Sequence, residues 1–168
     1  MRGSAPPHLS QPGVAERVKF TLVPVDFAGT VTKWAERVGS TGLSYDALVP
    51  MNGVSAGCTV NLYVLWSTNA TTTTHTATWR LRYAAVTPET DACTATVAVL
   101  DTAITSDACI GTADVVQRTA AGVINAGNFL EGDLLKLRLD LSAVSGFALG
   151  TDIVRWHGVE VEVVRAVV

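Results

Sequence analysis

The stretch that decides the fold is "GCTVNLYVLWSTNATTTTHTATWRLRYAAV", residues 57–86. It contains two runs of alternating apolar and polar residues, joined by a tract that is nearly all threonine. Successive side chains of a β-strand point to opposite faces, so each run predicts a strand with one apolar and one solvated face. The predicted apolar faces are Val60, Leu62, Val64 and Trp66 in the first run, and Ala77, Trp79, Leu81 and Tyr83 in the second. We interpret the threonine tract as the polar joint of a hairpin between the two strands.

Similar alternation recurs on both sides of this stretch. Further strands are predicted over residues 18–25, 43–49, 95–100, 133–141 and 152–164, whereas residues 112–124 fit either a strand or a short helix. Such clean alternation is typical of antiparallel sheets with one solvated side. The segments are separated by clusters of Gly, Asn, Asp and Ser. They predict an all-β protein, an antiparallel two-sheet β-sandwich of jelly-roll type with an extended N-terminal arm.

Composition limits the function classes. The chain has 168 residues, of which 48% are hydrophobic and 16% charged, enough for one domain with one core. Its net charge of −3 and lack of a basic cluster in sequence argue against nucleic-acid binding. The chain contains no run of about 18 apolar residues, so no membrane span is expected, and the opening "MRGSAPPHLSQPG" lacks the apolar segment of a secretory signal.

The sequence predicts an extended segment followed by a folded domain. Residues 1–17 are rich in Pro, Ser, Gly and Ala without any period, and they predict an extended arm; residues 18–168 form the sandwich domain. Trp34 lies in the polar, loop-like "TVTKWAERVGS" and is a candidate interface aromatic. The candidate residues for an interface with another protein or another subunit are Pro6, Pro7, Leu9, Pro12, Val14 and Trp34.

One stretch matches a catalytic pattern. "GVSAG", residues 53–57, satisfies the G-x-S-x-G pattern around Ser55, and Asp152 and His157 follow in a suitable order. That motif works where a strand turns sharply into a helix. Here the next residues predict a strand, so a turn that leads into a strand is the better interpretation. We therefore expect that the chain has no catalytic residue and is not an enzyme.

The histidines and cysteines do not predict a cofactor or a metal. His8, His75 and His157 are scattered, and Cys58, Cys93 and Cys109 lack metal-ligand spacing. A zinc site formed by His75, Cys93 and Cys109 is conceivable but disfavoured. A disulfide between Cys93 and Cys109 stays open, with small buried thiols as the alternative.

The charged and aromatic strand residues each have two interpretations. Outward charges can form a ligand face or pair across neighbouring strands, and cross-strand pairing is favoured. These residues are Arg80, Arg82, Lys136, Arg138, Asp140, Glu160 and Glu162. The tryptophans Trp66, Trp79 and Trp156 can stack on sugars or pack in the core; their apolar strand faces favour the core.

Several motifs, taken in order, resemble a family of jelly-roll structural proteins of tailed bacteriophages. They are "KWAERV", "LSYDALVP", the pair "LYVLWST" and "ATWRLRYAAV", "LEGDLLKLRLDL" and "GTDIVRWHGVEVEVV", within residues 26–164. The resemblance implies a virion component made in the host cytoplasm, most simply a capsid decoration (cement) protein on the capsid surface. It also implies a homotrimer whose partner is the major capsid protein. The alternatives are a head or tail fibre module, a carbohydrate-binding module, and an esterase that uses Ser55.

Overall fold

The computed structural model describes residues 16–22, 35–38, 44–51, 54, 57–91, 101–148 and 151–165. In these residues it contains strands and one short 3-10 turn, and no helix long and apolar enough to cross a membrane. The elements are β1 (Glu16–Leu22), β2 (Ala35–Val38), β3 (Ser44–Pro50), β4 (Cys58–Thr68), β5 (Thr76–Val86), β6 (Asp101–Ala108), β7 (Gln117–Asn125), η1 (Ala126–Asn128), β8 (Leu134–Ser145) and β9 (Ile153–Arg165).

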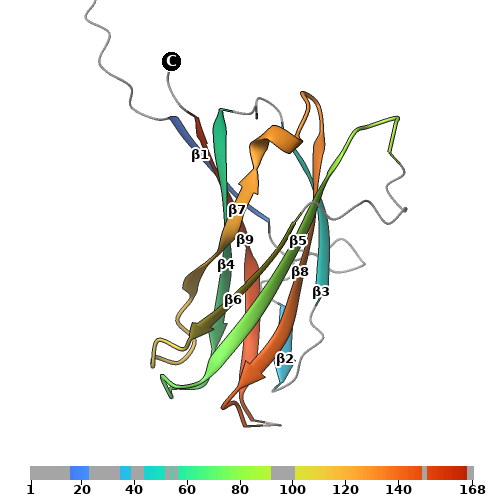
Figure 1. The fold of residues 1–168 in the computed structure, drawn as a ribbon. Helices are drawn as coiled ribbons and strands as arrows, with labels where there is room; N and C mark the ends of the chain where they lie inside the picture. The colour runs from blue at the N-terminus through green and yellow to red at the C-terminus, as the bar shows by residue number, and fades with distance from the viewer. Residues whose placement is uncertain are drawn as a thin grey trace, which may run out of the picture.

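The strands form two antiparallel sheets that face each other, which confirms the predicted all-β sandwich (Figure 1). One sheet has the order β1-β9-β4-β7, with β2 also paired to β9, and the other has the order β3-β8-β5-β6. Strand pairing is nested: β5 pairs with β6, β4 with β7, β3 with β8, and β1 with β9. The chain therefore resembles one long hairpin that has rolled up, so that strands distant in sequence become neighbours.

The apolar faces predicted by alternation fill the space between the sheets. In β4 and β5 the alternate side chains named above are buried, which confirms their predicted orientation. The alternating leucines of β8 and valines of β9 are buried as well; they are Leu135, Leu137, Leu139, Leu141, Val159, Val161 and Val163. Trp66 of β4 and Trp79 of β5 meet across the core with ring centroids 6.1 Å apart. The largest fully buried side chains include three tryptophans, Trp66, Trp79 and Trp156. Their predicted place in the core is confirmed.

The hairpin predicted between residues 58–66 and 76–86 is wrong. β4 and β5 lie in different sheets, and the threonine tract crosses from one sheet to the other. Both strands have a strongly apolar face, and the two faces bury each other across the core, as the contact between Trp66 and Trp79 shows. The exposed residues Thr71–Thr74 keep this crossing in solvent.

A β-bulge determines how β9 presents its side chains. Leu65 is paired with Gly158 and Trp66 with Trp156, so His157 is the extra residue. Bulges re-aim neighbouring side chains. Here Trp156 enters the core, 1% exposed, while His157 lies on the outer face of the sheet, half-buried.

The strand bounds differ from expectation in several places. β6 and β2 were not predicted, and the segment 112–124 contains a strand only from Gln117 onward. The predicted strand 95–100 lies outside the described residues. β1 begins at Glu16, so the last two residues assigned to the arm belong to the sandwich; residues 1–15 lie outside the described part.

A buried polar network joins the edges of the two sheets at β6 and β7. Trp66 Nε1 donates to Thr119 Oγ1 at 2.8 Å, and the Thr119 hydroxyl in turn donates to the carboxylate of Asp107 in β6. Gln117 Nε2 also donates to Asp107, at 3.3 Å, and to the backbone oxygen of Ala108 at 3.0 Å. Each hydrogen bond between β6 and β7 crosses from one sheet to the other, so the network holds this side of the sandwich closed.

Candidate functional site

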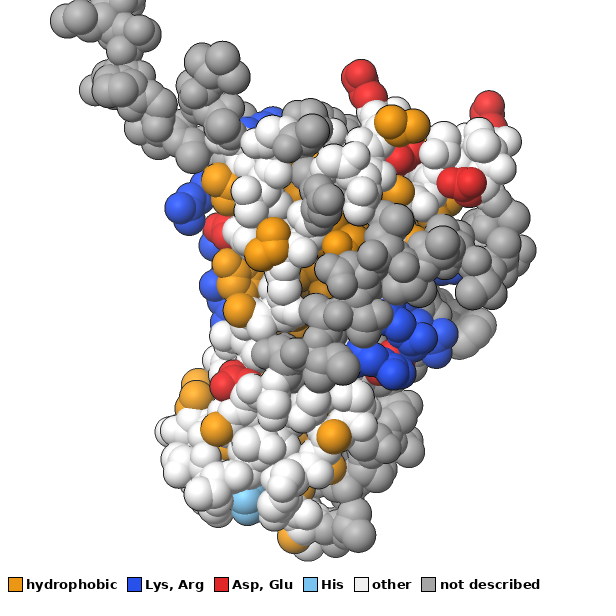
Figure 2. Space-filling model, viewed as in Figure 1, with side chains coloured by type: hydrophobic (Ala, Val, Ile, Leu, Met, Phe, Trp, Pro, Cys, Tyr) orange, Lys and Arg blue, Asp and Glu red, His pale blue; other side chains and the backbone are white. Residues whose placement is uncertain are grey.

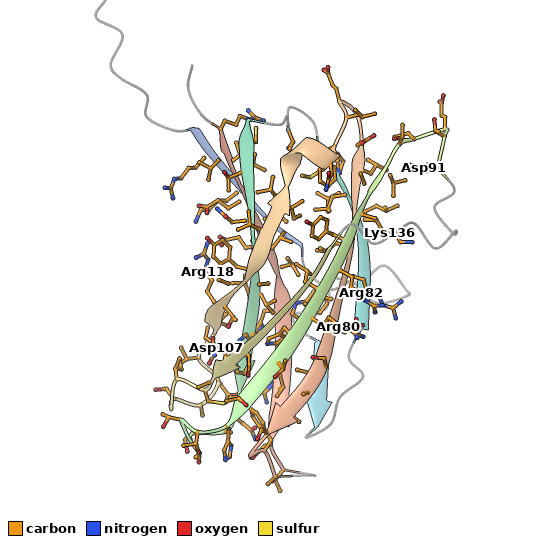
Figure 3. The ribbon with its side chains drawn as sticks, in the orientation of Figure 1. Arg80, Arg82, Asp91, Asp107, Arg118 and Lys136 are labelled. Atoms are coloured by element: carbon orange, nitrogen blue, oxygen red, sulfur yellow. The ribbon has the colours of Figure 1, made fainter. Side chains whose placement is uncertain are left out.

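Four cations gather on the outer face of the β5–β8 sheet. Arg80 and Arg82 of β5 and Lys136 of β8 project from adjacent strands, away from the core (Figure 3). Arg138 lies two residues after Lys136 in β8 and therefore on the same outer face. We call these four residues the basic patch. They are a third of the chain's 12 Lys and Arg, and they form a blue area on one flank of the molecule (Figure 2).

One carboxylate lies in the middle of the basic patch. Asp140 is 8% exposed and contacts Arg82 Nη2 at 2.6 Å, Arg80 Nη2 at 3.5 Å and Arg138 Nε at 3.4 Å. This confirms the expected pairing of opposite charges across strands. Among the side chains that the structure describes on this face, four are positive and Asp140 is negative, so this described set carries a positive excess.

The carboxyl end of β5 and the start of β8 carry the opposite charge. Glu89 and Asp91 in the turn after β5, and Glu131 in the loop before β8, are exposed. Thr87 Oγ1 donates to Asp133 Oδ1 at 2.9 Å and so ties the two loops together. We call Glu89, Asp91 and Glu131 the acidic end. Figure 3 shows Asp91 at the end of the sandwich, beyond Lys136, Arg82 and Arg80.

The outer face of the other sheet holds a more balanced set of charges around Glu162. This side chain is 4% exposed, and its Oε2 accepts hydrogen bonds from Asn61 Nδ2 at 3.2 Å and from the Tyr63 hydroxyl at 3.3 Å. Lys19 Nζ and Arg17 Nη1 lie 3.3 and 3.5 Å from Oε1. Burial opposes the ionisation of Glu162, but the hydrogen bonds from Asn61 and Lys19 outweigh it and hold its pKa below the usual value.

Glu160 forms the second half of this set. Arg118 Nη2 lies 2.6 Å from Glu160 Oε1, and its guanidinium stacks over the Tyr63 ring. The hydrogen bond from Arg118 is the main cause that lowers the pKa of Glu160, with a further contribution from Lys19. Because these contacts join β1, β9, β4 and β7, they stabilise the sheet rather than leave charge available for a ligand.

These pKa shifts predict acid sensitivity. A carboxylate whose pKa is lowered by folding stabilises the protein above the pKa of the unfolded chain, about 4.3 for Glu, and this stabilisation is lost as pH falls through the folded pKa. We therefore expect the melting temperature to fall between about pH 5 and pH 3. Glu162→Gln should melt lower than the unchanged protein at pH 7, and the difference should shrink at pH 3. Thr112→Ser, a change at an exposed loop position that removes no titratable group, is the control; an equal loss at both pH values for Glu162→Gln would contradict the prediction.

A serine and a histidine lie together in a shallow hollow at the opposite end of the sandwich from the acidic end. Ser67 Oγ and His157 Nε2 are 2.8 Å apart, and the hollow, about 260 Å³, is also lined by Asp114 and Arg155, which form an ion pair. The His157 bulge creates this arrangement. Ser–His contacts of this length occur in nucleophilic catalysis. Ser67, however, exposes only 1% of its surface, so its hydroxyl has little access to a substrate.

The catalytic pattern around Ser55, which the sequence disfavours, is not tested by the structure. Ser55 lies outside the described residues, and His157 contacts Ser67 instead. Asp152 Oδ2 lies 3.8 Å from His75 Nδ1 and accepts a hydrogen bond from the backbone N–H of Ala148.

The other predicted site residues have different outcomes. Cys109 is a buried free thiol whose pKa is raised by burial, and its amide donates to the backbone oxygen of His75. Cys93 lies outside the described residues, and the described part of the chain contains no group of three metal-binding side chains. The proposed interface residues also lie outside the part that the structure describes; they are Pro6, Pro7, Leu9, Pro12, Val14 and Trp34.

Sequence reasoning missed the acidic end and the hollow. One signal for the acidic end was present, because no Lys or Arg occurs between Arg82 and Arg118, nor between Arg118 and Lys136. The loops in these two segments therefore carry only negative charge. The contact between Ser67 and His157 had no signal in sequence, because it depends on which strands are neighbours.

We compared the chain with protein families, curated proteins and solved structures. It matches no protein-family model and no curated protein. Among solved structures it is similar to a chain in the structure of infectious bursal disease virus, Gt strain, with 9% sequence identity and a TM-score of 0.45. The alignment covers 89% of this chain and 32% of that chain, so this chain spans about a third of that chain's length.

Proposed function

We propose that this chain is a structural component of a virus particle, and more narrowly a capsid decoration protein of a tailed bacteriophage that binds the outer shell as a trimer. The observation that carries the proposal is the nested strand pairing, with sheet orders β1-β9-β4-β7 and β3-β8-β5-β6. We infer from it that the sandwich is a jelly roll, an architecture that recurs in viral capsid and lectin domains. The resemblance of the sequence motifs to phage structural proteins favours the viral class.

The packing of the tryptophans supports the same choice. A lectin that stacked sugars on Trp66, Trp79 or Trp156 would need an exposed ring face. All three rings are at most 1% exposed and fill the space between the sheets. The result is a stiff body whose outer faces are charged, which suits a protein that acts by binding another protein surface.

The proposal is tested first on purified particles of the phage that encodes the chain. Quantitative mass spectrometry should find the chain in the virion at a copy number on the scale of the major capsid protein. A copy number on the scale of tail proteins would support the fibre alternative instead. Absence from the particle would overturn the proposal.

Binding to the shell is tested with particles that lack the protein. The purified chain should bind them and raise their resistance to heat. A variant without residues 1–15, which leaves β1 intact from Glu16, should keep the melting temperature of the full chain but bind less. Undiminished binding would place the contact on the sandwich itself. Retention on a glycan array, without particle binding, would favour the carbohydrate-binding alternative.

A further inference from the structure

Charge is divided between two regions at different heights of the sandwich. The basic patch runs along the outer face of β5 and β8, with Arg80 and Arg82 at mid-length of β5, and the acidic end lies beyond the last residue of β5 (Figure 3). At about 3.3 Å per residue of strand, Arg80 and Arg82 lie roughly 23 and 17 Å from Thr87, the first residue after β5. Lys136 is the register partner of Ala84 and lies nearer, at roughly 10 Å. The screening length in physiological salt is about 8 Å. The acidic end therefore does little to neutralise Arg80 and Arg82 of the same chain.

Each charged region also carries an exposed leucine. Leu130 precedes Glu131 at the acidic end and is 68% exposed. Leu48 of β3 is 44% exposed and is the register partner of Lys136, so it lies on the same outer face as the basic patch. Protein interfaces commonly combine apolar anchors with a charged rim. Each region therefore combines an exposed leucine with charged side chains, and the two regions carry opposite charge.

We propose that the acidic end of one copy docks on the basic patch of a second copy, and that this head-to-flank contact builds the trimer. The inference rests on the trimer proposed above. Because the two surfaces differ, the contact is heterologous, and a heterologous contact forms a closed ring when its rotation closes. Glu89, Asp91 and Glu131 of one copy would supply carboxylates to the guanidinium groups of Arg80 and Arg82 on the next. Arginine suits this role because its planar fork matches a carboxylate.

Charge reversal on each surface tests the contact. The first variant is Arg80→Glu with Lys136→Glu, which leaves Arg82 and Arg138 to hold Asp140; the second is Glu89→Lys with Glu131→Lys. The unchanged protein should have a mass of about 53 kDa by light scattering, three times the 17.6 kDa chain. Each variant should fall to about the mass of one chain. Because the two variants change separate surfaces, a folding failure of one leaves the other as a test.

Restoring the charge match provides the decisive result. A chain that carries all four substitutions should regain the mass of about 53 kDa, because every end-to-flank contact of its ring is again between opposite charges. Thr112→Glu with Ala113→Glu, which adds negative charge in the exposed loop at the opposite end, is the control and should leave the mass unchanged. Raising the salt to about 1 M, where the screening length is about 3 Å, should favour the single chain.

Three outcomes would overturn the inference. These are a single-chain mass for the unchanged protein, an unchanged mass for both reversed variants, and a failure of the fourfold variant to reassociate while it stays folded. A reversed variant that keeps its mass but loses particle binding would assign the basic patch to a capsid protein instead. If the unchanged protein has a single-chain mass and still binds particles, the contact between copies is overturned while the proposed virion role stays in place.

Discussion

Trp79→Ala is expected to lower the free energy of unfolding by about 3–5 kcal/mol, the usual cost when a large aromatic is removed from a core. Trp79 is 1% exposed and meets Trp66 from the opposite sheet, so the cavity would open between the two layers. Domains of this size have about 5–15 kcal/mol of stability in total. Chemical denaturation should therefore show a large shift of the midpoint, or a chain that does not fold at all.

Val123→Ala is the matched control for this prediction. Val123 lies on β7 with 59% of its surface exposed, and shortening it should change the stability by less than about 0.5 kcal/mol. Equal midpoints for the unchanged protein and Trp79→Ala would show that the sandwich does not depend on contact between its two layers at this point.

Thr119→Val should cost about 2 kcal/mol although it hardly changes the side-chain volume. The hydroxyl accepts from Trp66 Nε1 and donates to Asp107, and valine can do neither. A buried polar group that loses its partner costs about 1–3 kcal/mol. The change should therefore loosen the connection between β6 and β7, which thermal denaturation would detect.

Thr78→Val provides the comparison for Thr119→Val. Its hydroxyl donates to Ser106 Oγ at 3.2 Å on the solvent side of β5, where water can replace the lost hydrogen bond. We expect a change within about 0.5 kcal/mol. A similar loss in both variants would mean that the β-propensity of the position, rather than the buried network, determines the result.

Alternation in the sequence predicted the orientation of side chains but not the neighbours of each strand. The apolar faces of 58–66 and 76–86 were correct because a strand's period of two is a local property. Their pairing as a hairpin was wrong, because a short polar joint between two strands fits a turn within a sheet and a crossing between sheets equally well. The partners of β4 are β7 and β9, which follow much later in the chain.

For the charged surfaces too, the sequence predicted which way the side chains point but not which residues become neighbours. Arg80 and Arg82 could be placed on the outer side of their strand from sequence, and their pairing with opposite charge was expected. That the partner is Asp140 follows only from the pairing of β5 with β8. The acidic end likewise needs two loops from separate parts of the chain, joined through Thr87 and Asp133. β2, with only four residues, is too short for its period to be recognised among polar neighbours.

The nested pairing has a consequence for the order in which the chain can fold. β9 lies between β1 and β4 in its sheet, yet it is synthesised after every strand that it joins. While the ribosome is still producing residues 153–165, β1 and β4 have edges with no β9 to cover them. Uncovered edges are prone to pair with other chains. The sheet that contains β9 can therefore close only after translation has passed Arg165, and a ribosome that stalls before that point leaves an aggregation-prone nascent chain.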